Sequence, residues 1–151
     1  MAARYRERRA KISLPACAIL DGDQAKMEGN HLNVLNKRLE SPNDEAKEAV
    51  NQWARNHISY LPGSEWPEKW ILAQDKSVFS PLSNEFGVRE QELNQFIDEA
   101  LLAGKHNEFW TLAQKLNREV TYIRARFCKC AIESNPSESK RLRETVRKFL
   151  E

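Results

Sequence analysis

Two carboxylates separated by one glycine are the residues of this chain best suited to chemistry. Asp21-Gly22-Asp23 directly follows the short apolar run of residues 16–20. In extended backbone, residues two apart point to the same side, so Asp21 and Asp23 can face one point, and Gly22 lets the backbone turn there. Two adjacent like charges cost free energy unless a cation or several donors compensate them. The pair therefore predicts a site for Mg²⁺ or Mn²⁺.

A turn is the simpler interpretation of the same tripeptide. Asp-Gly is a strong turn signal, and Asp21 or Asp23 could accept backbone hydrogen bonds in that turn. The three residues by themselves favour this turn, so the metal site depends on the elements around them.

The first half of the chain alternates strand patterns with helix patterns. Residues 16–20 predict a strand buried on both faces, and residues 58–61 predict a second strand. Between them, Ser41 as N-cap and the apolar spacing that follows predict a helix over residues 42–56. Another helix is predicted to begin at Pro67. This order is typical of a small α/β domain with parallel strands.

The second half of the chain has only helical periodicity, from Val78 onward. We therefore predict an α/β fold, with a small, mainly parallel sheet and covering helices in residues 1–77 and a helical part in residues 78–151. A chain of 151 residues is long enough to bury a core, and we expect the two parts to form one compact domain.

Composition narrows the functional class only a little. The net charge of +2 is too small to argue for nucleic acid by itself, although basic residues crowd both ends of the chain. No apolar run approaches a membrane span and the N-terminus lacks a signal-peptide pattern, so we expect a cytoplasmic protein that does not bind membranes. Cys17, Cys128 and Cys130 lack zinc-site spacing and are expected to be reduced structural thiols, with Cys17 in the buried strand.

Three short motifs follow one another along the chain. They are Asp21-Gly22-Asp23 after the first strand, Leu61-Pro62-Gly63 after the second, and Trp66-Pro67-Glu68-Lys69 at a helix start. This order resembles the C-terminal nuclease part of the overcoming-lysogenization-defect family and of related phage-defence ATPases, which carry a Toprim (topoisomerase-primase) domain behind an ABC-type ATPase. The resemblance runs from about Leu14 onward and includes the segment from Lys105 to Trp110.

The resemblance implies a metal-dependent nuclease that acts on DNA phosphodiesters. By position, Asp21, Asp23 and Glu68 would be its catalytic residues and its ligands for Mg²⁺ or Mn²⁺. An ATPase domain or subunit, upstream or in trans, is the implied partner, and an oligomer is compatible with this arrangement. Taken alone, Glu68 is equally well explained as a first-turn carboxylate that complements the helix dipole.

One feature of the family has no counterpart in this chain. The first catalytic glutamate of a Toprim site precedes the Asp-x-Asp motif, and Glu7 lies in no predicted strand that could present it. No phosphate-binding loop is found among the glycines either. The chain therefore resembles the back part of such a protein, as a truncated gene, a split subunit completed by a partner, or an inactive remnant.

Two other functions remain open at this stage. The first is a non-catalytic, helix-rich interaction or DNA-binding module, in which Asp21-Gly22-Asp23 is only a turn. The second is a magnesium-dependent phosphohydrolase, because a strand followed by Asp-x-Asp also occurs in phosphatases, with Asp21 as the nucleophile.

Overall fold

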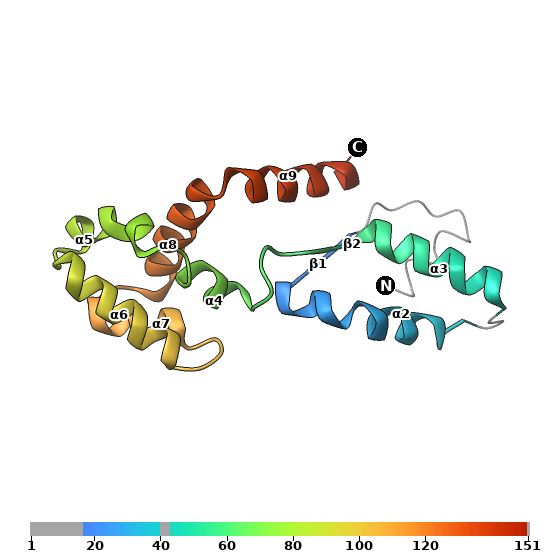
Figure 1. Ribbon diagram of the computed structural model, residues 1–151, viewed down its shortest axis with the longest axis horizontal. Helices are drawn as coiled ribbons and strands as arrows, with labels where there is room; N and C mark the ends of the chain where they lie inside the picture. The colour runs from blue at the N-terminus through green and yellow to red at the C-terminus, as the bar shows by residue number, and fades with distance from the viewer. Residues whose placement is uncertain (1–16, 40–42, 151) are drawn as a thin grey trace. The chain divides into compact units, whose positions relative to one another are not determined.

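The computed structural model describes residues 17–39 and 43–150, and most of these residues are helical (Figure 1). The strands are β1 (Ala18–Leu20) and β2 (Ile58–Tyr60). The 3-10 helices are η1 (Gly22–Met27) and η2 (Lys76–Phe79). The α-helices are α2 (Glu28–Asn36), α3 (Asp44–His57), α4 (Pro67–Leu72), α5 (Ser80–Phe86), α6 (Glu90–Leu102), α7 (Glu108–Leu116), α8 (Val120–Ser134) and α9 (Pro136–Leu150).

The chain divides into two compact units, which are described separately below. The N-terminal unit comprises Met1–Ser64 with Arg141–Glu151, and the central unit comprises Glu65–Lys140. The break therefore falls between β2 and α4, so that α4 belongs with the helices that follow it. No helix in the described part of the chain is both long and apolar enough to span a membrane.

Within residues 17–39 and 43–64, the sheet of the N-terminal unit is a single parallel pair of strands. β1 pairs with β2 in the register Ala18–Ile58, Ile19–Ser59 and Leu20–Tyr60. Parallel strands need a long crossover, which η1, α2 and α3 provide. The predicted parallel strands are confirmed, but helices outweigh the sheet throughout the described residues, so the α/β description holds only in this coarse form.

Burial of the first strand is where the sequence prediction is wrong. Cys17 is exposed, Ile19 is 41% exposed, and Ala18 and Leu20 are half-buried. Among the described residues β1 pairs with β2 alone, and a sheet of two strands leaves much of each strand uncovered. Residues 1–16, which include the start of the predicted strand, lie outside the described part of the chain.

Two helices supply the core of the N-terminal unit. In Figure 1, α2 and α3 lie side by side. Their shared hydrophobic cluster consists of Leu32, Leu35, Val50, Trp53 and Ala54. Asn43 caps α3, because its Oδ1 accepts a hydrogen bond of 2.7 Å from the Ala46 N–H. The predicted N-cap, Ser41, lies outside the described residues.

The core of the central unit is larger and aromatic. Phe127 of α8 is fully buried, and its ring centroid lies 4.9 Å from that of Phe79, 6.2 Å from that of Phe86 and 6.4 Å from that of Phe109. These rings come from η2, α5 and α7, so one side chain joins three other elements. The predicted helical character of the chain after Val78 is confirmed.

Candidate functional site

The carboxyl ends of β1 and β2 meet at the edge of the sheet. The hydrogen-bond ladder continues one residue beyond β2, where the Leu61 N–H donates to the Leu20 carbonyl over 2.8 Å. Because parallel strands end on the same side of a sheet, the motif after β1 lies beside the motif after β2. Asp21-Gly22-Asp23 and Leu61-Pro62-Gly63, each predicted to follow a strand, therefore lie side by side in the structure.

Gly22 lies close against the segment that follows β2. A Cβ atom at this position would lie 2.6 Å from the carbonyl oxygen of Gly63, 2.9 Å from that of Pro62 and 3.0 Å from that of Leu61. All three are backbone atoms, which cannot move aside as a flexible side chain could. Gly22 is also buried, so any other residue between Asp21 and Asp23 would place its Cβ against these carbonyl oxygens.

Asp21 and Asp23 are both half-buried, but the backbone between them is not extended. Asp21 ends the extended segment, with φ −59° and ψ 149°, and Asp23 lies in the first turn of η1. The side-chain alternation of a strand thus stops at Gly22, because the chain turns into a 3-10 helix there. Both carboxylates remain at the carboxyl end of β1, although strand geometry alone does not aim them at one point.

The hydrogen bonds of the turn leave the Asp21 side chain without a capping role. The Gln24 N–H donates to the Asp21 backbone carbonyl over 3.0 Å, whereas the Asp21 carboxylate makes no capping bond to η1. The Asp23 Oδ1 accepts a bond of 3.2 Å from the Gln24 side-chain amide. A pair of carboxylates suits Mg²⁺, which is usually held by one or two carboxylates together with water and substrate phosphate. Within the described ranges, no group of three or more His, Cys, Asp or Glu residues could hold a metal ion.

Glu68, the third predicted ligand, belongs to the central unit. It lies in the first turn of α4, which begins at Pro67 as predicted, and its Oε2 lies 3.3 Å from Nδ1 of His106. Asp21 and Asp23 belong to the N-terminal unit. The structure therefore brings the two aspartates together at one strand end and gives Glu68 a partner within its own unit.

A buried glutamate beside Trp66 is the feature that the sequence did not predict. Glu108 is fully buried, and its Oε1 accepts a hydrogen bond of 2.5 Å from the indole N–H of Trp66. Its Oε2 has no hydrogen-bond partner among the described residues. The Nζ atoms of Lys69 and Lys105 lie 4.9 Å and 5.4 Å from the centroid of the Trp66 ring. These contacts hold the start of α4 against the start of α7.

The sequence does contain a signal for this burial. Glu108 precedes Leu112 by four residues and Leu116 by eight, so it lies on the apolar stripe of its helix. A carboxylate on such a stripe predicts a specific partner, because burying it without one is costly.

The cysteines of the central unit are poorly suited to nucleophilic chemistry. Burial is the main cause that raises the pKa of the Cys128 thiol above its usual value, and the nearby negative charge of Glu68 adds to it. Burial likewise raises the pKa of Cys130. Both thiols are therefore protonated at neutral pH and less reactive than an ordinary cysteine.

Comparisons with protein-family models, with curated proteins and with solved structures give no match for this chain. The residues that the structure describes are mostly helical and include one short parallel strand pair. Asp21 and Asp23 lie where the first of these strands ends, next to the segment that follows the second.

Proposed function

We propose that this chain is part of a Toprim-like, metal-dependent nuclease that acts on DNA phosphodiesters. The observation that carries the proposal is the contact between residues 21–23 and 61–63 at the carboxyl ends of β1 and β2. In sheets with parallel strands, ligands bind outside the carboxyl ends of the strands. The two motifs that resemble the Toprim family thus occupy the expected place for a ligand.

In this proposal, Asp21 and Asp23 hold Mg²⁺ or Mn²⁺, and Gly22 lets the segment after β2 approach. A bound divalent cation supplies a water of lowered pKa and charge stabilisation for the phosphate that is cleaved. The two carboxylates by themselves repel a DNA phosphate, so binding of DNA at this place depends on the cation. Metal affinity and DNA affinity at the strand end are therefore coupled.

An ATPase domain or subunit, upstream or in trans, completes the proposed site. It would supply the glutamate that precedes Asp-x-Asp in Toprim domains, since Glu7 lies in no predicted strand and outside the described residues. Glu68 as a further ligand rests on the resemblance alone. Its bond to His106 is an ion pair only when the imidazole is protonated.

A calorimetric titration with Mn²⁺ tests the proposal on the purified chain. We expect the parent to bind Mn²⁺ and Asp21→Asn to bind it at least about tenfold more weakly. Removing a group that only supports a metal ligand lowers metal affinity by about 10- to 100-fold, and removing a ligand itself should lower the affinity by at least as much. Asp44→Asn is the matched control, since Asp44 is an exposed aspartate at the start of α3 in the same unit. Equal affinities of the parent and Asp21→Asn, or no binding by the parent, would contradict the proposal.

A helix-rich interaction or DNA-binding module is the second candidate. The bond from the Gln24 N–H to the Asp21 carbonyl favours it, because this turn accounts for the Asp-Gly signal without any cation. This function predicts that Asp23→Asn unfolds at the same urea concentration as the parent at every magnesium concentration. A magnesium-dependent shift of the parent that Asp23→Asn lacks would exclude it.

A further inference from the structure

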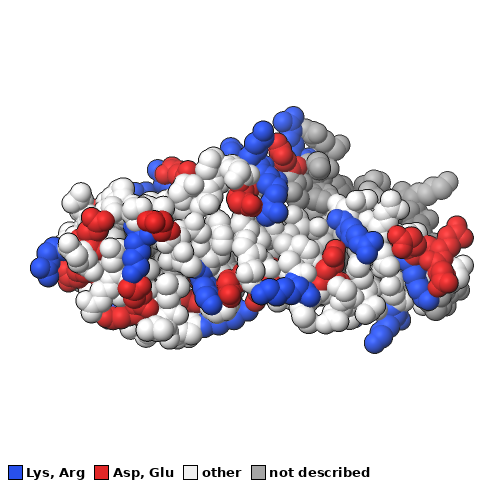
Figure 2. Space-filling model, viewed as in Figure 1, with Lys and Arg blue, Asp and Glu red and all other residues white. Residues whose placement is uncertain are grey.

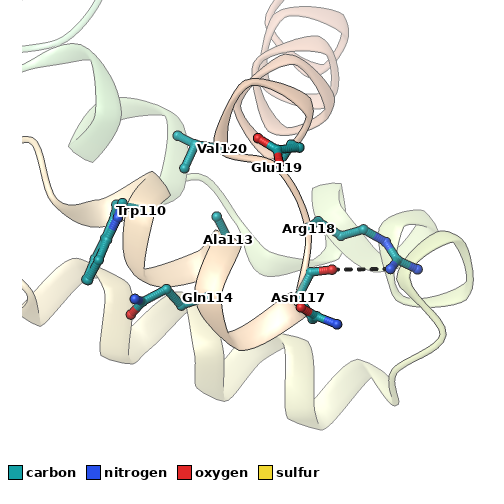
Figure 3. Close-up of a pocket in the computed structure, with 7 residues that line it drawn as sticks. All are labelled: Trp110, Ala113, Gln114, Asn117, Arg118, Glu119 and Val120. Atoms are coloured by element: carbon teal, nitrogen blue, oxygen red, sulfur yellow. Dashed lines mark hydrogen bonds between the residues drawn. The ribbon is translucent and has the colours of Figure 1, made fainter.

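A hollow of about 520 Å³ opens on the central unit, and none of its lining residues belongs to the proposed metal site. Its lining comes from one face of α7 and from the connection to α8 (Figure 3). Trp110, Ala113, Gln114 and Asn117 recur at helical spacing on that face. The volume lies within the range of small-ligand sites, so one nucleotide-sized group can enter.

An exposed indole forms one end of the hollow. Trp110 is 55% exposed, whereas its neighbour Phe109 is buried in the core. Ala113 is almost fully buried and has only a methyl side chain, which leaves open space next to the indole (Figure 3). An aromatic ring beside such a space offers its face to another planar group.

The other lining groups suit a nucleobase and its phosphate. Gln114 and Asn117 carry carboxamides, which can donate to and accept from the edge of a base. Arg118, at the end of the hollow opposite Trp110, donates from Nη1 to the Asn117 carbonyl over 3.3 Å, which leaves its other N–H groups for a phosphate (Figure 3).

The backbone holds this wall in place before any ligand arrives. The Asn117 N–H donates to the Gln114 carbonyl and the Arg118 N–H donates to the Ala113 carbonyl, over 3.2 Å and 3.0 Å. With Asn117 at φ 49°, these bonds form a Schellman motif, which fixes the end of α7. A preformed wall lowers the entropic cost of binding.

We propose that this hollow binds single-stranded DNA, with one unpaired base stacked on Trp110 and an adjacent phosphate on Arg118. A duplex hides the faces of its bases, whereas an unpaired base of any type can stack on an indole. Figure 2 shows basic and acidic side chains interspersed on the face in view. Glu119 also lines the hollow and opposes the phosphate.

Fluorescence anisotropy with a labelled oligothymidylate of about 12 nucleotides tests the proposal, because this length lies within usual site sizes. The buffer contains EDTA, so the result does not depend on the proposed metal site. Trp110→Ala should bind about 5- to 150-fold more weakly, the range expected for one lost stacked base, and Trp110→Phe should lose less. Leu102→Ala, which removes an 86% exposed apolar side chain elsewhere in this unit, should bind like the parent.

Two charge variants check the phosphate contact. Arg118→Ala should reduce the slope of log affinity against log salt by about 0.7, the value for one phosphate on a single strand. Arg89→Ala, at an 86% exposed arginine outside the hollow, should leave the slope unchanged. Glu119→Gln should tighten binding. Equal affinities of the parent and Trp110→Ala, or no binding by the parent at low salt, would overturn the proposal.

Discussion

The two compact units differ in what holds each of them together. The central unit is built on buried aromatic rings around Phe127, to which η2, α5 and α7 all contribute. The N-terminal unit has a smaller cluster on α2 and α3, and each of its strands has three residues. Among the described residues, the candidate metal site thus belongs to the unit with fewer buried apolar side chains. This is the expected place for a site that is completed by binding, because regions with few buried contacts have the lowest local stability.

The largest effect should come from the aromatic core. Phe127→Ala removes a fully buried ring, and such a change typically costs about 3–5 kcal/mol. We expect hydrogen exchange to accelerate most in α6, α7 and α8, and much less in α2 and α3. Leu102→Ala, at an 86% exposed position of α6, is the control and should change little. Equal acceleration in both units would show that they unfold as one.

In the N-terminal unit, the corresponding sensitive position is a glycine. Gly22→Ala places a Cβ against three backbone carbonyls, and overpacking of this kind costs about 1–3 kcal/mol. Hydrogen exchange should accelerate in β1 and β2, and Mn²⁺ affinity should fall with it. Gly29→Ala in α2 is the matched control, because a Cβ there meets nothing within 4 Å and alanine favours a helix. If Gly22→Ala and Gly29→Ala change hydrogen exchange and Mn²⁺ affinity equally, the close approach at Gly22 does not contribute to the stability of this unit.

The bond between Trp66 and Glu108 should have a comparable but somewhat smaller effect, confined to the central unit. Trp66→Phe removes the indole N–H that donates a hydrogen bond to Oε1 of Glu108. Leaving this buried acceptor unpaired costs about 1–3 kcal/mol. Urea unfolding should show this loss for the single variant. The double variant with Glu108→Leu should recover part of it, since a pair of apolar groups needs no hydrogen bond. A double variant that is less stable than Trp66→Phe would show that the carboxylate has another stabilising role.

The smallest effect should come from an ion pair on the surface of the central unit. Hydrogen bonds from Arg126 and Tyr122 hold the pKa of Glu85 below its ordinary value of 4.5. The folded state therefore binds fewer protons than the unfolded state, so this contribution is present above pH 4.5 and is lost as the pH falls through the lower folded pKa. Near neutral pH, Glu85→Gln should cost less than about 1 kcal/mol, because the pair is partly solvated.

Urea unfolding of the parent and Glu85→Gln across this pH range measures that contribution. The difference between the two should shrink as the pH is lowered below 4.5, while Glu119→Gln, at an exposed glutamate of the same unit, serves as the control. A difference that stays constant with pH would mean that Arg126 and Tyr122 do not stabilise the ionised carboxylate.

Local patterns predicted more of this structure than long-range ones. The parallel strands, the helix that begins at Pro67 and the helical second half follow from periodicity and capping, which act within a few residues. The exposure of Ile19 depends on how many strands flank β1, and no local pattern encodes that number. The 3-10 helix at Gly22 likewise ends the extended backbone that the predicted pair of carboxylates needed.

The candidate sites show the same division. The sequence placed Asp21 and Asp23 at the end of the first strand and Leu61-Pro62-Gly63 after the second, and the parallel pairing in the structure brings these two segments side by side. It did not predict the bond between Trp66 and Glu108, which joins residues 42 positions apart. The hollow beside Trp110 was also missed, because it depends on how the connection to α8 folds back over α7.

The most direct test of the central claim is Mn²⁺-induced broadening of backbone amide signals in the NMR spectrum of the whole chain. If Asp21 and Asp23 hold the cation at the carboxyl ends of β1 and β2, the signals of residues 20–24, Leu61 and Gly63 should broaden together at the lowest Mn²⁺ concentrations. In Asp21→Asn, this broadening should need much more Mn²⁺. Broadening that begins elsewhere in the chain, or that is unchanged in Asp21→Asn, would contradict a metal site at this strand end.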